Sequence, residues 1–140
     1  MCLFANTRFP NIAQEDIVCY KVLKRMPSVK YKGKLGYFGL YYDEYEYENF
    51  NEFNTVIFFD FDQDNDDVIN FGLHSFAVLE RAILLYCLYK HDTDRADVSL
   101  VKCIIPKGAR YYEGYDCGYN SGYCSESLII KEEVDVESLI

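Results

Sequence analysis

Five tyrosines stand within the thirteen residues from 111 to 123, and glycines at 114, 118 and 122 separate them. Glycine opens backbone conformations that other side chains normally forbid, so a segment of this kind favours turns. It cannot bury a continuous apolar face. This feature constrains the chain most, because residues 108–125 must form either a loop that carries aromatic rings or a binding surface.

The aromatic segment has the chemistry of a nucleotide site. Tyrosine rings can stack on a flat ligand, glycines let backbone amides approach it, and two cations at the start of the segment can meet phosphate oxygens. The alternative is a mobile β-hairpin whose rings cover the sheet and need no ligand. The expected ligand-binding residues are His74, Ser75, Lys107, Arg110, Tyr111, Tyr112, Tyr115 and Tyr119.

His74 and Ser75 belong to this set because they precede the strongest helix pattern of the chain. Apolar residues recur at three- and four-residue spacing from 76 to 90, and the hydroxyl of Ser75 is suited to cap the first turn. A histidine beside exposed helix amides can help to hold a phosphate or a carboxylate. The alternative is a histidine that closes the loop with a backbone hydrogen bond. Apolar residues on every side of the helix predict that it lies across a sheet and is well covered.

Strands are expected where apolar and β-branched residues gather. Tyrosine and glutamate alternate over 45–48, which indicates an edge strand, whereas the continuous apolar run 55–59 indicates a buried strand. Further strands are expected at 16–23, 98–105 and 127–130. Together these patterns predict an α+β fold, with a small mixed or antiparallel sheet of about five strands packed by one main helix (about 76–90) in a single domain, 1–140.

Charge is distributed unevenly along the chain. The formal net charge is −9, and residues 41–67 contain ten acidic residues and no basic one. Such a chain is poorly suited to a nucleic acid duplex, because neutralisation of phosphates supplies most of that affinity. An acidic, aromatic block can instead face a basic partner protein. The residues expected at that interface are Tyr45 and Tyr47 as anchors, with Glu46 and Glu48.

The three aspartates Asp60, Asp62 and Asp64 match the first ligands of a calcium loop. Asn65 replaces the glycine of that loop and Phe71 replaces its glutamate, so a solvated acidic turn is the main interpretation and a weak divalent-ion site the alternative. We expect no metal and no cofactor.

Cysteines offer two further possibilities. Removal of Met1 would leave Cys2 as an N-terminal nucleophile, whereas the alternative is a buried thiol. Cys117 and Cys124 flank the glycine-rich segment, where a zinc site is the alternative and ordinary packing or loop thiols are the main interpretation. No signal peptide and no apolar run of membrane-spanning length occurs, so we expect a cytoplasmic protein that contacts no membrane.

Several segments resemble small uncharacterised proteins of gut bacteria and their phages: 1–3, 15–23, 72–76, 101–108 and 111–114. That resemblance implies an accessory protein of a mobile element, and proteins of this kind often interfere with host defence. The order of a strand, Gly72 with His74, a helix and a strand is also similar to ADP-ribosyltransferase-like folds, but no Glu-x-Glu pair follows the last expected strand.

Three functions follow in order of preference. The first is a binding module that captures a small phosphate-bearing, nucleotide-like ligand, such as a nucleotide signal of host defence. The second is an acidic interaction or inhibitor protein that binds a basic surface of a host protein. The third is an ADP-ribosyltransferase-like enzyme, although no catalytic residues are assigned. A homo-oligomer is possible with any of them.

Overall fold

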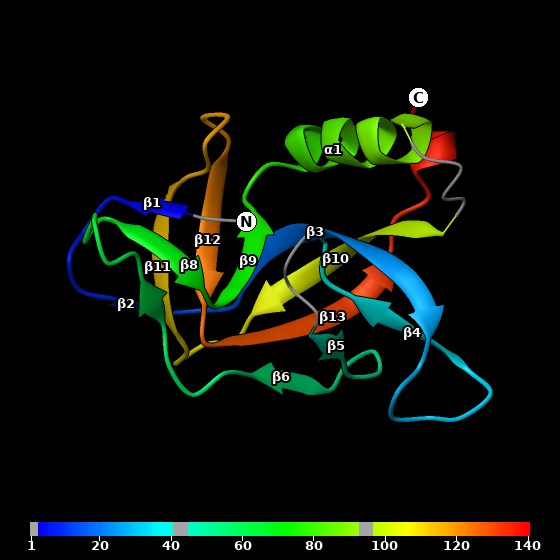
Figure 1. Cartoon of the computed structure of the whole chain (residues 1–140), viewed down its shortest axis with the longest axis horizontal. Helices are drawn as coiled ribbons and strands as arrows, with labels where there is room; N and C mark the ends of the chain where they lie inside the picture. The colour runs from blue at the N-terminus through cyan, green and yellow to red at the C-terminus, as the bar shows by residue number, and fades with distance from the viewer. Residues whose placement is uncertain (1–2, 41–44, 93–96) are drawn as a thin grey trace.

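A computed structural model describes residues 3–40, 45–92 and 97–140. The chain is mostly strand, at 47% against 12% helix, and ten strands follow one another in a sheet that curls into a half-barrel (Figure 1). The expected five-stranded sheet packed by a main helix is therefore wrong. The sequence patterns missed many short strands of two to four residues, because such strands are defined by their neighbours rather than by a long local pattern.

All strand pairings among the described residues are antiparallel, and the order along the sheet is β6-β13-β10-β3-β9-β12-β11-β1-β8-β7. Three further strands attach beside this path, with β2 on β11, β4 on β3, and β5 on β4. The described strands are β1 (Leu3–Ala5), β2 (Asn11–Ile12), β3 (Ile17–Pro27), β4 (Leu35–Phe38), β5 (Glu46–Tyr47), β6 (Phe53–Thr55), β7 (Asp60–Phe61), β8 (Val68–Phe71), β9 (Leu73–Phe76), β10 (Val98–Ile105), β11 (Arg110–Tyr115), β12 (Ser121–Ser125) and β13 (Ser127–Glu133).

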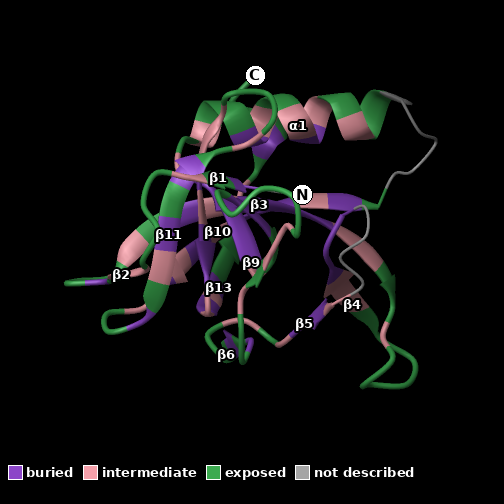
Figure 2. Cartoon of the chain, turned by 60° about the vertical axis from the view of Figure 1, so that its left-hand side comes forward, coloured by how far each residue is buried: buried purple, intermediate pink, exposed green. Residues whose placement is uncertain are grey.

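The centre of the sheet is formed by β3, β10 and β13. The strand expected at 98–105 is confirmed with its bounds, and β3 pairs with it over eight residues from Val98 opposite Lys24 to Ile105 opposite Ile17. Side chains of β10 alternate between the two faces, so Val101, Cys103 and Ile105 enter the largest apolar cluster. Figure 2 shows that buried residues concentrate in these central strands.

The helix α1 (Leu79–Asp92) packs on the opposite face of β3, β9 and β10. It starts three residues later than expected, because residues 73–76 form β9, which pairs with both β12 and β3. Ser75 is therefore a strand residue and does not cap the helix. Ala82 and Tyr86 face the sheet, but Leu84 and Leu88 are exposed, so the expectation of a well-covered helix is wrong.

The two ends of the half-barrel are β6 and β7, which are consecutive in the chain. Only residues 56–59 join them, so an extended connection from Thr55 to Asp60 spans at most about 18 Å. The buried strand expected at 55–59 is wrong, because β6 ends at Thr55 and no ladder includes residues 56–59. In Figure 1, β6 lies at the rim of the molecule farthest from α1.

Candidate interaction surface

The tyrosine-rich segment forms a paired hairpin of β11 and β12. Tyr111 lies opposite Ser125 and Tyr115 opposite Ser121, with the turn between them. Glycine is needed here for close packing rather than for a loop. A Cβ atom added to Gly114 would lie 1.9 Å from the carbonyl oxygen of Phe4, and one added to Gly122 would lie 2.7 Å from that of Ser75.

The four expected stacking tyrosines point in different directions. Tyr112 is only 5% exposed, and the rings of Phe59 and Phe61 contact it edge-on at centroid distances of 5.1 and 5.5 Å. Tyr111 lies on the other face of the sheet, where it packs against Tyr123. The two remaining tyrosines, Tyr115 and Tyr119, are exposed, and Tyr119 adopts a φ of +60° at the turn.

The two expected cations each lie beside a carboxylate. The Nε atom of Arg110 donates to Oε2 of Glu126 at 2.9 Å, and the backbone amide of Arg110 donates to Oε1 of the same residue. The amide of Lys107 donates to the Asp16 carboxylate at 2.9 Å. A phosphate near the Arg110 guanidinium would therefore meet the Glu126 carboxylate as well, which weakens the attraction.

His74 is buried in β9, and its side chain shares a face with Tyr112 because Cys124 lies opposite both residues. Its Nδ1 atom is 3.2 Å from the carbonyl of Gly72 and its Nε2 atom 3.3 Å from that of Ile69. Burial, with the charge of Lys21, lowers the pKa of His74 to about 3. The imidazole is therefore neutral at pH 7.

Ser75 belongs to the opposite face of β9, because its ladder partner is Tyr123. Its buried hydroxyl lies near the Cys19 thiol and has no hydrogen-bond partner of regular geometry among the described residues. The eight expected ligand residues are thus divided between two faces of the sheet and a turn, and the structure does not bring them together.

The segment 45–48 contains the expected edge strand, since β5 pairs only with β4 among the described residues, but its side chains are not free for a partner. Tyr47 is 3% exposed, and Tyr45 packs against it edge-on at 4.8 Å. The carboxylate of Glu46 accepts from the Ser28 hydroxyl at 2.8 Å and from the Val29 amide at 2.6 Å. Burial alone would raise the pKa of Glu46, but these hydrogen bonds outweigh it and hold the pKa below its usual value.

Glu48 forms an ion pair with Lys30, and its amide donates to Asn54. The loop 28–30 therefore engages both carboxylates of the segment, Glu46 by hydrogen bonds and Glu48 by an ion pair. This segment offers little to a partner, because both carboxylates are engaged, Tyr47 is buried and Tyr45 is half-buried.

The second half of the acidic block is exposed. Residues 60–67 connect β7 to β8 in a tight hairpin that is closed by a bond from the Asp62 amide to the Val68 carbonyl. No aspartate of this hairpin forms an ion pair with a described residue. Within the described ranges, no group of three potential metal ligands is present. The unpaired aspartates are Asp60, Asp62, Asp64, Asp66 and Asp67.

Beside these aspartates lies an exposed apolar group, which we name the aromatic edge: Phe53, Ile57, Phe58 and Phe71. Ile57 is 88% exposed and Phe58 54%, and the ring of Phe58 stacks on Phe71 at 5.1 Å. Val56 and Phe59 turn inward instead. The stacked pair Phe58 and Phe71 is an exposed apolar surface, and such surfaces often mark contact sites.

Sequence reasoning missed the aromatic edge because it took residues 55–59 for a buried strand. A signal against that interpretation was available. A continuously apolar strand must be covered on both faces, and a chain with a single helix pattern has little material for a second layer. The run therefore had to expose part of its apolar surface.

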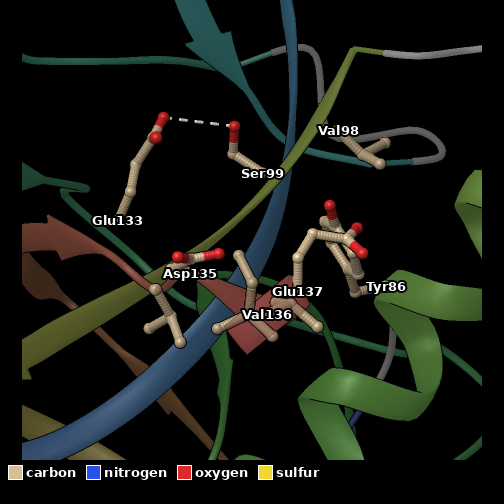
Figure 3. A pocket seen from close by; sticks show the side chains of 9 residues that line it. Tyr86, Val98, Ser99, Glu133, Asp135, Val136 and Glu137 are labelled. Atoms are coloured by element: carbon tan, nitrogen blue, oxygen red, sulfur yellow. Dashed lines mark hydrogen bonds between the residues drawn. The ribbon is translucent and has the colours of Figure 1, made fainter. Parts of the chain in front are cut away.

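A separate cleft of about 420 Å³ lies between α1 and the C-terminal segment (Figure 3). Its floor is apolar and its rim carries the carboxylates of Glu133, Asp135 and Glu137. Glu133 accepts from the Ser99 hydroxyl at 3.2 Å, and Glu137 from Lys90 at 3.0 Å. Two of the three carboxylates at the rim of the cleft are therefore already hydrogen-bonded within the protein.

No protein-family model, curated protein or solved structure matches the chain. Within the described ranges, no helix has the length and apolar character that crossing a membrane requires. Cys2 lies outside the described residues. Cys117 is exposed and Cys124 is buried, where burial raises its pKa to about 12.

Proposed function

We propose that this protein is an acidic interaction protein that binds a basic surface of a partner protein through the aromatic edge and the aspartates of the 60–67 hairpin. The single observation that carries the proposal is the exposed stack of Phe58 on Phe71 beside five unpaired aspartates. The expected anchors Tyr45 and Tyr47 have no part in it, since they pack inside.

The two components of this surface have different roles. Burial of an exposed phenylalanine or isoleucine side chain contributes about 1.5–3 kcal/mol, so Phe58, Phe71 and Ile57 can supply most of the affinity. The aspartates raise the association rate with a basic partner and disfavour acidic ones, and both effects weaken at high salt. The net charge of −9 acts in the same direction.

Capture of a phosphate-bearing nucleotide stays a prediction from the sequence, and the geometry supports it less well. Its tyrosines lie on different faces, its histidine is neutral at pH 7, and Arg110 is paired with Glu126. The ADP-ribosyltransferase-like activity and the role against host defence likewise stay predictions. The resemblance to small proteins of gut bacteria and their phages would make the partner a host protein, and the cytoplasmic location stays a prediction from the sequence.

A fluorescent peptide that alternates lysine and valine tests the charge requirement. We expect the triple variant Asp62→Asn, Asp64→Asn, Asp66→Asn to bind this peptide about tenfold more weakly than the wild type in an anisotropy titration at low salt. The matched control changes three exposed acids elsewhere, Glu15→Gln, Glu80→Gln and Glu132→Gln, and should alter binding by less than about twofold.

Equal losses in the two triple variants would show that only net charge matters, and the proposed surface would be wrong. The same conclusion would follow if a peptide that alternates glutamate and valine bound equally well.

A further inference from the structure

The strand β6 is an end of the sheet, and β13 is its only ladder partner among the described residues. Phe53 lies opposite Ile129, Asn54 opposite Leu128 and Thr55 opposite Ser127. The other side of β6 therefore presents unpaired backbone groups. Such an edge can accept a further strand from another chain.

The hydrogen-bond pattern identifies which groups face outward. The Val56 amide, directly after the end of β6, donates to the Glu126 carbonyl at 2.9 Å, so this bond continues the hydrogen-bonding pattern of the β6–β13 pair by one residue. Bonded positions alternate along an antiparallel pair, so the N–H and C=O groups of Thr55 and Phe53 point away from β13. These are the groups that an added strand would bind.

Side chains of this segment alternate in the same way. Asn54 is fully buried, where its Oδ1 atom accepts from the Glu48 amide at 2.6 Å and its Nδ2 atom donates to the Leu128 carbonyl at 3.1 Å. Val56 is buried as well, whereas Phe53, Thr55 and Ile57 are exposed. The buried residues fix β6 in an extended shape, and the exposed ones offer an apolar row to a neighbouring strand.

Natural sheets usually protect an edge with lysine, proline or a charge within the strand. Residues 53–58 contain none of these, and the nearest charged residues along the chain are Glu52 and Asp60, both acidic. The edge is open along its length and bounded by negative charge. A second copy of this chain would place acidic flanks against acidic flanks, whereas a basic segment would complement them.

We propose that the free edge of β6 takes up an extended, basic segment of the partner as an added strand. The inference rests on the proposed function and specifies its binding mode: backbone pairing with Thr55 and Phe53, apolar contact with Ile57, and attraction to Asp60 and the 60–67 hairpin.

A proline at Thr55 tests the backbone contact. Thr55→Pro removes an outward N–H and leaves the ladder bonds of Asn54 and Val56 with β13, and proline is tolerated where an edge strand faces solvent. We expect it to bind the lysine–valine peptide about tenfold more weakly. The control Thr55→Val keeps the amide and should bind within about twofold of the wild type.

A second measurement uses the unchanged protein. The lysine–valine peptide with methyl groups on alternate backbone nitrogens keeps its charge and side chains but cannot pair along a strand. We expect about a tenfold loss of affinity for this peptide. We also expect the Thr55 amide to exchange its hydrogen more slowly when the unmethylated peptide is bound, and not with the methylated one. This measurement decides the matter if Thr55→Pro fails to fold.

Each outcome separates the two proposals. If the methylated peptide binds as well as the unmethylated one while the triple aspartate variant loses affinity, strand addition is wrong and the proposed function stands. If neither change weakens binding, both are wrong. A dimer in sedimentation that the lysine–valine peptide does not dissociate would show that a second copy occupies β6, which would overturn the inference.

Discussion

The tyrosine-rich hairpin β11–β12 and the apolar segment 53–59 differ in burial, and the difference is the opposite of what their compositions suggest. The hairpin is rich in glycine and hydroxyl groups, yet Tyr112 is 5% exposed within it. The segment 53–59 has five apolar residues and no charge, yet Ile57 is 88% exposed. Composition alone would have reversed these two values.

Ladder partners explain the difference. The strand β11 pairs with β12 on one side and with β1 and β2 on the other, so its side chains are held against packed layers. Residues 56–59 have no ladder partner and only cross from β6 to β7. A segment that closes a gap buries whichever side chains meet the neighbouring layers, here Val56 and Phe59, and exposes the others.

The largest expected effect tests the hairpin as a packed element. Gly114→Ala would place a Cβ atom 1.9 Å from the Phe4 carbonyl oxygen, so we expect it to lower the free energy of unfolding by about 4 kcal/mol. Gly118→Ala in the turn is the control and should cost less than about 1 kcal/mol, because only flexible side-chain atoms lie near. Urea denaturation measures both. Similar costs would mean that the hairpin is a loose loop.

Aromatic truncations compare the two regions directly. Tyr112→Ala removes a ring that packs under Phe59 and Phe61, so we expect a loss of about 3 kcal/mol in the free energy of unfolding. Ile57→Ala removes an exposed side chain and should cost less than about 0.5 kcal/mol. Chemical denaturation of the two variants under one condition is the measurement. A larger cost at Ile57 would contradict the assignment of inside and outside.

The buried histidine gives the hairpin region a pH dependence that the aromatic edge lacks. The pKa of His74 is about 3 in the folded protein against about 6.5 when unfolded, so the unfolded state binds the proton first as the pH falls. Stability is retained above pH 6.5 and falls between pH 6.5 and 3, by about 2 kcal/mol at pH 5. His74→Gln removes this contribution. An equal pH dependence in both proteins, followed by thermal unfolding, would exclude it.

The smallest effect concerns Arg110. Its pair with Glu126 is half exposed, so Arg110→Ala should lower the free energy of unfolding by about 0.5 kcal/mol. We also expect no nucleotide in a panel of mono-, di- and cyclic nucleotides to raise the melting temperature of the wild type. A rise of several degrees in the melting temperature that Arg110→Ala abolishes would instead support a nucleotide site at the hairpin.

Long regular patterns made part of the fold predictable. Val98–Ile105 alternates and is flanked by polar residues and a proline, and the apolar spacing from 79 onward marks α1, although its start was misplaced. The short strands were not predictable, because two-residue elements such as Asp60–Phe61 exist only through pairing with β8. The proposed interaction surface follows from the sequence only in part. The acidic block 41–67 indicated a basic partner, but only tertiary pairing shows that Glu46 and Tyr47 turn inward while Phe58 turns outward.

The most direct test of the central claim compares two double variants in the peptide titration. Phe58→Ala with Phe71→Ala removes the stacked pair, and Tyr115→Ala with Tyr119→Ala removes two exposed rings of the hairpin. The account predicts that the first double variant binds the lysine–valine peptide at least about tenfold more weakly and that the second binds like the wild type. Loss of binding in the tyrosine variant with retention in the phenylalanine variant would contradict it.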